Sequence, residues 1–141
     1  MTATTQARLP DLLSGAERQV ALRIEQALGR SGVTLEQWRV MCCLSDGTGH
    51  PMSEIARYAL VPAPTLTKHV DRLTERGLVY RRPDDRDRRK VLVFMAARGG
   101  RLFSRLDEAV RAEEARITRL LGADSVNELQ KLLALALERL D

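Results

Sequence analysis

One segment of the sequence, residues 64–95, limits the possible folds more than any other. A helical pattern of apolar residues begins at Pro64 and is stopped by Gly77, and two apolar runs then enclose an arginine-rich turn. Glycine commonly ends a helix, and apolar runs on either side of a polar turn favour paired strands. We therefore predict a helix followed by a β-hairpin with strands at residues 78–82 and 91–95.

A shorter helix is predicted directly before this segment, over residues 52–60, after a loop at residues 47–51. Residues 61–63 form a turn, and Pro64 suits the first position of the next helix because its missing N–H would be unpaired there anyway. The predicted buried stripe of that helix consists of Leu66, Val70 and Leu73. Two short helices joined in this way form a helix-turn-helix, and the hairpin that follows reads as a wing.

The positive charge of the chain is concentrated in the same region. Residues 65–90 contain nine Lys/Arg and five Asp/Glu, a difference of +4 that equals the net charge of the whole 141-residue chain. The other residues are balanced, with 14 positive and 14 negative side chains. A basic surface confined to one helix and one hairpin is the electrostatic footprint of a module that docks on a phosphate backbone. We therefore expect the chain to bind duplex DNA.

Bulk composition excludes several classes of protein. With 44% hydrophobic residues, the chain is long enough for one core, and no run of about 20 apolar residues offers a membrane span. The N-terminal residues lack the apolar run of a signal peptide, so we expect a cytoplasmic protein without membrane contact. Cys42 and Cys43 are adjacent on a predicted helix, where their side chains diverge, and with two separated histidines they fall short of a zinc set. We expect no metal and no cofactor.

Two helices are predicted before the helix-turn-helix. Apolar residues recur every fourth position over residues 10–29, which gives one helical face. Thr34 with Gln37 forms a capping box that opens a second helix, which extends to about Asp46. The residues that this second helix is expected to direct inward are Leu35, Trp38, Met41, Cys42 and Leu44.

The C-terminal third is predicted to be helical. A long helix is terminated by Gly122, and Ser125 with Glu128 forms a second capping box that opens the last helix. That last helix is apolar over more than half its circumference, through Val126, Leu129, Leu132, Leu133, Leu135, Leu137 and Leu140. Such a face often packs against a partner subunit, although the first helix of the same chain is an alternative cover. We favour a dimer.

Two motifs carry a resemblance to a known family. They are TLTKHVDRLTERGLV at residues 65–79 and DRRKVLV at residues 87–93. With them, residues 53–99 resemble the multiple antibiotic resistance regulator (MarR) family of winged-helix repressors. Asp87 and Arg89 occupy the places of the Asp-x-Arg element that this family carries in its wing. The order of the predicted helices also fits, so the resemblance spans nearly the whole chain.

The resemblance implies a mainly α fold with a small β-hairpin wing. In it, residues 1–33 form an N-terminal arm and dimerisation helix, residues 34–99 the winged helix-turn-helix DNA-binding domain, and residues 100–141 the C-terminal dimerisation helices. The chain departs from the family at two places. The helix that begins near residue 64, here called the reading helix, is usually capped by a hydroxyl residue in this family, where this chain has Ala63. At residues 95–96, where Leu-Thr is common in the family, this chain has Met-Ala. Each change removes a helix cap worth about 1 kcal/mol.

The resemblance also implies a homodimer on a pseudo-palindromic operator, because two-fold related reading helices reach successive major grooves. The candidate major-groove residues are Thr65, Thr67, Lys68, His69 and Arg72. Lys68 suits a phosphate, since its ammonium is a point charge, whereas Arg72 suits a bidentate contact to guanine.

The wing contributes three further candidate residues, Arg86, Arg88 and Arg89, for a narrow minor groove. We expect Asp87 to brace the guanidinium of Arg89 or of a nearby arginine. Asp84 and Asp85 are interpreted as solvated turn residues.

Members of the resembled family commonly release DNA when a small anionic or aromatic compound fills a cleft beside the winged domain. The resemblance therefore implies a repressor of a nearby operon that responds to such an effector. Arg18, Arg23 and Trp38 are the candidate pocket residues, since an arginine pairs with a carboxylate. Taken singly, Trp38 is better explained as core and the arginines as surface charges.

Other classes of function fit less well. No catalytic triad, paired carboxylates or phosphate loop stands out, so we do not expect an enzyme. A redox sensor acting through Cys42 and Cys43 is an alternative, although buried thiols are usually inert. A winged-helix protein-interaction module is another, but it would not need the wing arginines. A sequence-tolerant architectural DNA binder would carry more charge than +4.

Overall fold

The computed structural model of the protein describes residues 7–141, so residues 1–6 of the expected N-terminal arm lie outside the described part. In chain order the elements are α1 (Leu9–Leu28), the 3-10 turn η2 (Gly29–Ser31), α2 (Leu35–Leu44), β1 (His50–Pro51), α3 (Met52–Ala59), α4 (Ala63–Glu75), β2 (Val79–Pro83), β3 (Val91–Met95), α5 (Ala97–Leu121) and α6 (Ala123–Leu140). The fold is therefore mainly α-helical, and the strands form one antiparallel sheet in the order β1-β3-β2. The predicted fold class is confirmed.

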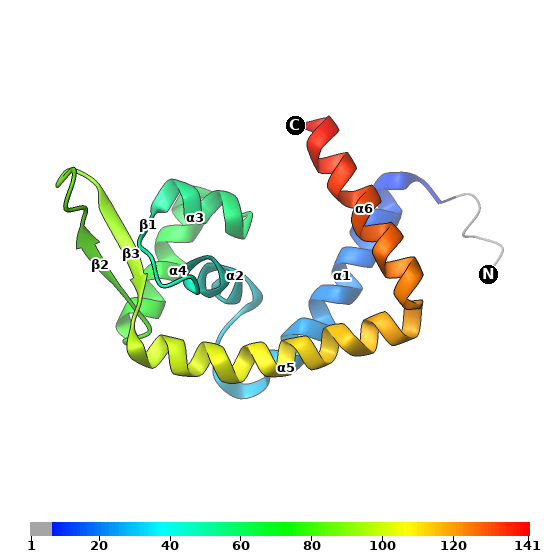
Figure 1. Ribbon diagram of the computed structural model, residues 1–141, viewed down its shortest axis with the longest axis horizontal. Coiled ribbons are helices and arrows are strands. Elements are labelled where there is room, and N and C mark those ends of the chain that lie inside the picture. Colours follow the sequence, from blue (N-terminus) through cyan, green and yellow to red (C-terminus); the bar gives the residue numbers. More distant parts are fainter. Residues whose placement is uncertain (1–6) are drawn as a thin grey trace.

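The chain forms two lobes that the long helix α5 connects (Figure 1). The head lobe contains α2, α3, α4 and the sheet, and the β2–β3 hairpin, here called the wing, projects away from it (Figure 1). The helical lobe contains α1, α6 and the C-terminal part of α5, against which α1 packs.

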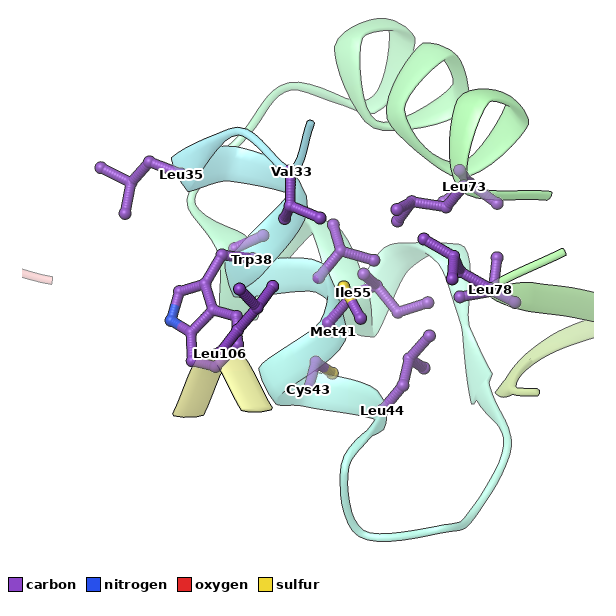
Figure 2. Packing of buried hydrophobic residues seen from close by; sticks show 14 of the residues in the cluster. Val33, Leu35, Trp38, Met41, Cys43, Leu44, Ile55, Leu73, Leu78 and Leu106 are labelled. Atoms are coloured by element: carbon purple, nitrogen blue, oxygen red, sulfur yellow. The ribbon is translucent and has the colours of Figure 1, made fainter. Parts of the chain in front are cut away.

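The core of the head lobe lies where α2, α3, α4 and the sheet meet. The predicted stripe of Leu66, Val70 and Leu73 on α4 is fully buried, as expected. Figure 2 shows Met41 and Ile55 packed between α2 and α3. Burying a side chain of this size contributes about 1.5–3 kcal/mol each, so this cluster fixes how α4 sits on the head lobe.

Several predicted helix ends are confirmed. The amide of Gln37 donates to the Thr34 hydroxyl, and the amide of Thr34 donates to the Gln37 side-chain oxygen, both at 3.2 Å. This is the predicted capping box, and α2 begins directly after it. Gly77 has a φ of 70°, in the left-handed region, and follows the last residues of α4 as predicted.

The expected loop at residues 47–51 is partly wrong. His50 and Pro51 form the short strand β1, which pairs antiparallel with Val93 and Leu92 of β3. A strand of two residues has no periodicity of its own. It forms here because the free edge of β3 offers unpaired backbone groups, a relationship between distant parts of the chain.

The expected start of α4 is wrong by one residue. The helix begins at Ala63 with Pro62 in the capping position, so Pro64 stands at the second helical position. Ala63 therefore lies inside the helix, whereas the resemblance to the MarR family placed it in the capping position. No side-chain cap is made here, nor at Ala96, which precedes α5.

The second predicted capping box is also wrong. The helix α6 begins at Ala123, directly after Gly122, so Ser125 and Glu128 lie inside the helix and do not cap it. The reason is Gly122, whose φ of 92° turns the chain so sharply that α6 starts within one residue of the end of α5.

The leucines of α6 remain accessible within the chain. Their exposed fractions run from 39% to 83% for Leu129, Leu132, Leu133, Leu135, Leu137 and Leu140. The alternative that the first helix covers this face is therefore wrong. No helix within residues 7–141 is both long enough and apolar enough to span a membrane.

Candidate nucleic-acid interface

The helix α4 buries one face and presents the other to solvent. Because Leu66, Val70 and Leu73 occupy the buried face, four of the five predicted major-groove residues are exposed, namely Thr65, Thr67, Lys68 and Arg72. The exposed side combines hydroxyl groups with two cationic groups. It can donate to phosphate oxygens and to base edges.

His69, the fifth candidate, lies at the edge of this face and is half-buried. Its Nδ1 atom is buried, with no hydrogen-bond partner within the described residues. A contact from this side chain to DNA therefore has to come from Nε2. Thr67 donates its hydroxyl to the carbonyl of Ala63 at 3.2 Å, and its oxygen stays free to accept.

The three predicted wing arginines, Arg86, Arg88 and Arg89, are exposed in the turn between β2 and β3. Two aspartates shape this turn. Asp84 accepts a hydrogen bond from the amide of Arg86, and Asp87 accepts one from the amide of Arg89, both at 3.1 Å. The turn is closed by a backbone bond from the amide of Asp84 to the carbonyl of Lys90 at 2.9 Å.

The structure shows Asp87 in contact with the backbone of Arg89, one of the arginines that it was expected to brace. Its carboxylate holds the backbone amide of Arg89, and within residues 7–141 it makes no ion pair with a guanidinium. A turn aspartate bonds a backbone amide two residues on, which is the shortest reach available to it. Asp84 likewise shapes the turn and is half-buried, whereas Asp85 is solvated as expected, 3.7 Å from Arg82.

Sequence reasoning missed two arginines on β2. Arg82 lies over the ring of Phe94, 5.0 Å from its centre, and Phe94 also stacks on Tyr80. Arg81 points to the opposite face of the strand, where it pairs with Asp71 of α4 at 2.5 Å. The alternation of side chains along a strand gives these opposite directions, but the partners on β3 and α4 could not be identified from spacing.

The three candidate effector residues do not meet in one pocket. Trp38 is only 5% exposed and stacks on Phe103, with ring centres 4.8 Å apart, so it belongs to the core. Arg23 pairs with the buried Glu113 of α5 at 2.9 Å, and Arg18 is exposed on α1. A shallow depression between the end of α2 and the start of α5 is lined by none of the three.

The carboxylate of Glu113 is held by two arginines. Arg116 donates to it at 2.6 Å and Arg23 at 2.9 Å, and these hydrogen bonds hold its pKa below the ordinary range. This group ties α1 to α5 inside the helical lobe. It is a structural ion pair, and the guanidinium of Arg23 remains partly exposed.

The two cysteines lie in an environment that suppresses reactivity. Burial, followed by the nearby carboxylate of Asp107, raises the pKa of Cys42 to about 12. Burial, followed by Glu54, raises the pKa of Cys43 to about 11. Both thiols are protonated at neutral pH, so the redox alternative is not favoured. Within residues 7–141 no cluster of His, Cys, Asp and Glu is arranged to hold a metal ion.

Comparisons with known proteins agree on one family. The MarR family model matches residues 33–91, which include α2, the helix-turn-helix and most of the wing. The transcriptional activatory protein BadR of Rhodopseudomonas palustris is 33% identical over 120 residues, which cover 82% of this chain and 67% of BadR.

Solved structures give the same picture. The transcriptional repressor CouR, bound to a 23-mer DNA duplex, is similar with a TM-score of 0.85 and 26% identity, over 94% of this chain and 93% of CouR. NadR in complex with 4-hydroxyphenylacetate is similar with a TM-score of 0.78 and 27% identity, over 91% of each chain.

Proposed function

Because the chain belongs to the MarR family of transcriptional regulators, we propose that it is a homodimeric repressor that binds a pseudo-palindromic operator by sequence. The observation that carries this proposal is the placement of exposed cationic side chains on two parts of the head lobe, Lys68 and Arg72 on α4 and Arg86, Arg88 and Arg89 in the wing. The exposed face of α4 and the arginine turn of the wing both lie there, and the rest of the chain has no net charge. CouR, a repressor, binds duplex DNA with a similar fold.

In this proposal α4 enters the major groove. Arg72 contacts guanine, since its planar group matches the two acceptors of that base, and Lys68 contacts phosphate. Thr65, Thr67 and His69 add polar contacts. Arg86, Arg88 and Arg89 lie along the adjacent minor groove, where a narrow groove deepens the negative potential.

In the proposed function the helical lobe forms the dimer. We assign DNA binding to residues 34–99 and dimerisation to the helices of residues 1–33 and 100–141. The exposed leucines of α6 support this division, because a face of that size is costly to leave in water. A two-fold dimer presents two copies of α4 to successive major grooves.

We further propose that a small anionic or aromatic compound releases the operator. NadR, which is similar over 91% of its length, binds 4-hydroxyphenylacetate, a compound of that class. Of the three predicted pocket residues, Arg18 and Arg23 keep accessible guanidinium groups that suit a carboxylate. Trp38 is assigned to the core instead.

The relatives are regulators of transcription, so we propose that the chain is not an enzyme and that it works in the cytoplasm, where the DNA is.

The test is a selection of duplexes from a random-sequence library with the full chain, followed by affinity measurements over a salt series. We expect one enriched palindromic sequence and an affinity that falls steeply with salt. Arg72→Ala and Arg89→Ala should each weaken binding to the selected duplex, roughly tenfold for a lost base contact. Arg105→Ala, which removes the same charge from an exposed position on α5, is the matched control and should bind normally.

The release step is tested on the same duplex. Addition of 4-hydroxyphenylacetate, benzoate or a neutral aromatic alcohol of similar size separates the effect of the carboxylate from that of the ring. If the complex of the chain with the selected duplex persists in the presence of all three compounds, the DNA-binding proposal stands and the proposed effector class is contradicted.

A further inference from the structure

An ion pair joins the wing to α4. The Nη2 atom of Arg81 on β2 lies 2.5 Å from Oδ1 of Asp71, and its Nη1 atom lies 3.5 Å from the hydroxyl oxygen of Thr74. That hydroxyl donates to the carbonyl of Val70 at 2.7 Å, so its oxygen is oriented to accept from Arg81. One guanidinium on the wing therefore contacts two side chains one turn apart on α4.

The strand geometry directs Arg81 toward α4. Its partner across the sheet is Val93, which is fully buried, so this face of the hairpin is the one that packs on the head lobe. Arg82, the next residue, faces the other side and lies over Phe94. A change in register of one residue would exchange the two arginines and break the ion pair.

Asp71 is an unexpected residue at this position. Its side chain is 52% exposed on a helix that, in the proposed function, approaches phosphates. A bare carboxylate there weakens DNA binding, since it adds repulsion to a surface that otherwise gains by neutralising phosphates. The position is understandable if the carboxylate has another task, and its contact with Arg81 supplies one.

We propose that Asp71 and Arg81 are positioning residues that fix the wing relative to α4. Held at this angle, the arginines at the tip of the wing reach the minor groove while α4 occupies the adjacent major groove. This inference rests on the proposed DNA-binding function. It assigns neither residue a contact with a base.

Removing one negative charge separates positioning from simple electrostatics. If Asp71 only repels DNA, Asp71→Asn tightens binding to the duplex selected by the wild-type chain. If it positions the wing, Asp71→Asn weakens binding although the net charge rises, by about three- to fivefold for a partly exposed pair. Asp85→Asn makes the same charge change at an exposed wing residue, and it should bind at least as tightly as the wild type.

Footprinting adds a readout that a loss of stability would not produce. Hydroxyl-radical cleavage reports on the minor groove, and methylation of guanine N7 by dimethyl sulfate reports on the major groove. With Asp71→Asn we expect minor-groove protection to be reduced and major-groove protection to remain. Asp71→Glu keeps the carboxylate and should restore the minor-groove protection. Thermal melting of each variant verifies that the head lobe is folded.

The outcomes distinguish this inference from the function on which it rests. Tighter or unchanged binding by Asp71→Asn, with the minor groove still protected, overturns the positioning role while the DNA-binding function stands. Equal loss of protection in both grooves also overturns it. If the wild-type chain selects no sequence and protects no duplex, the proposed function fails and the positioning role fails with it.

Discussion

Gly99, in the first turn of α5, lies directly against the carbonyl oxygen of Leu78. A Cβ atom added at Gly99 would stand 2.0 Å from that oxygen. The oxygen is also fixed, because it accepts a hydrogen bond of 2.9 Å from the amide of Ala96. The start of the connecting helix therefore rests on the junction between α4 and β2, and only glycine fits there.

We expect Gly99→Ala to destabilise the chain by about 1–3 kcal/mol, the usual effect of forcing a methyl group into a packed site. Gly100→Ala is the matched control. A Cβ at Gly100 meets nothing within 4 Å, and alanine in a helix is favoured over glycine by up to about 1 kcal/mol. Urea unfolding of the two variants measures the difference, and equal stabilities would contradict the close contact.

The reading helix and the wing strands could be predicted because their signals are local. The buried stripe of α4 recurs at helical spacing, and Gly77 marks where the helix ends. The strand of His50 and Pro51 could not be predicted, since it exists only through its pairing with β3. A pairing between residues more than 40 positions apart leaves no trace in local spacing.

Some features of the candidate site could also be predicted from the sequence, and others could not. Exposure of Lys68 and Arg72 follows from the helical period, which the sequence contains. The contacts of Asp71 with Arg81 and of Asp87 with the Arg89 amide depend on tertiary and turn geometry. The sequence identifies the basic residues, and the helical period predicts which of them are exposed. It does not identify the carboxylate that each arginine contacts in the folded chain.

His50 predicts a pH dependence of stability. Its Nδ1 lies 2.5 Å from Glu54 of α3 and its Nε2 lies 2.9 Å from Asp46 after α2. Burial lowers the pKa of His50, but the hydrogen bonds to Asp46 and Glu54 outweigh burial and raise it above the ordinary value of 6.5. The hydrogen bond from His50 in turn lowers the pKa of Asp46.

A raised pKa in the folded state means that this stabilisation is complete below pH 6.5 and is lost as the pH rises through the folded value. The melting temperature of the wild type should therefore exceed that of His50→Gln most at about pH 5.5, and the gap should narrow toward about pH 9. A difference in melting temperature that stays constant or widens with pH would contradict a stabilising role for the contacts of protonated His50 with Asp46 and Glu54.

The raised pKa values of Cys42 and Cys43 predict slow alkylation and oxidation of both thiols in the folded chain. With pKa values of about 12 and about 11 instead of 9.0, the thiolate fractions of Cys42 and Cys43 are lower by at least roughly a hundredfold. We expect iodoacetamide to label both thiols much more slowly in buffer than in denaturant, measured by mass spectrometry. Peroxide should leave affinity for the selected duplex unchanged. Rapid native labelling, or DNA release by peroxide that Cys42→Ser abolishes, would restore the redox alternative.

The exposed apolar face of α6 predicts the oligomeric state. Leu132 is 54% exposed within the chain, and burying it against a second copy removes apolar surface from water. A glutamate there would place two unpaired charges in a two-fold interface, so Leu132→Glu should be monomeric in analytical ultracentrifugation. Its affinity for a palindromic duplex should fall, because one head lobe no longer holds the other close to its half-site. Leu60→Glu makes the same change on the head lobe at a side chain that is 77% exposed, and it should remain dimeric. A dimer that tolerates Leu132→Glu would place the interface elsewhere.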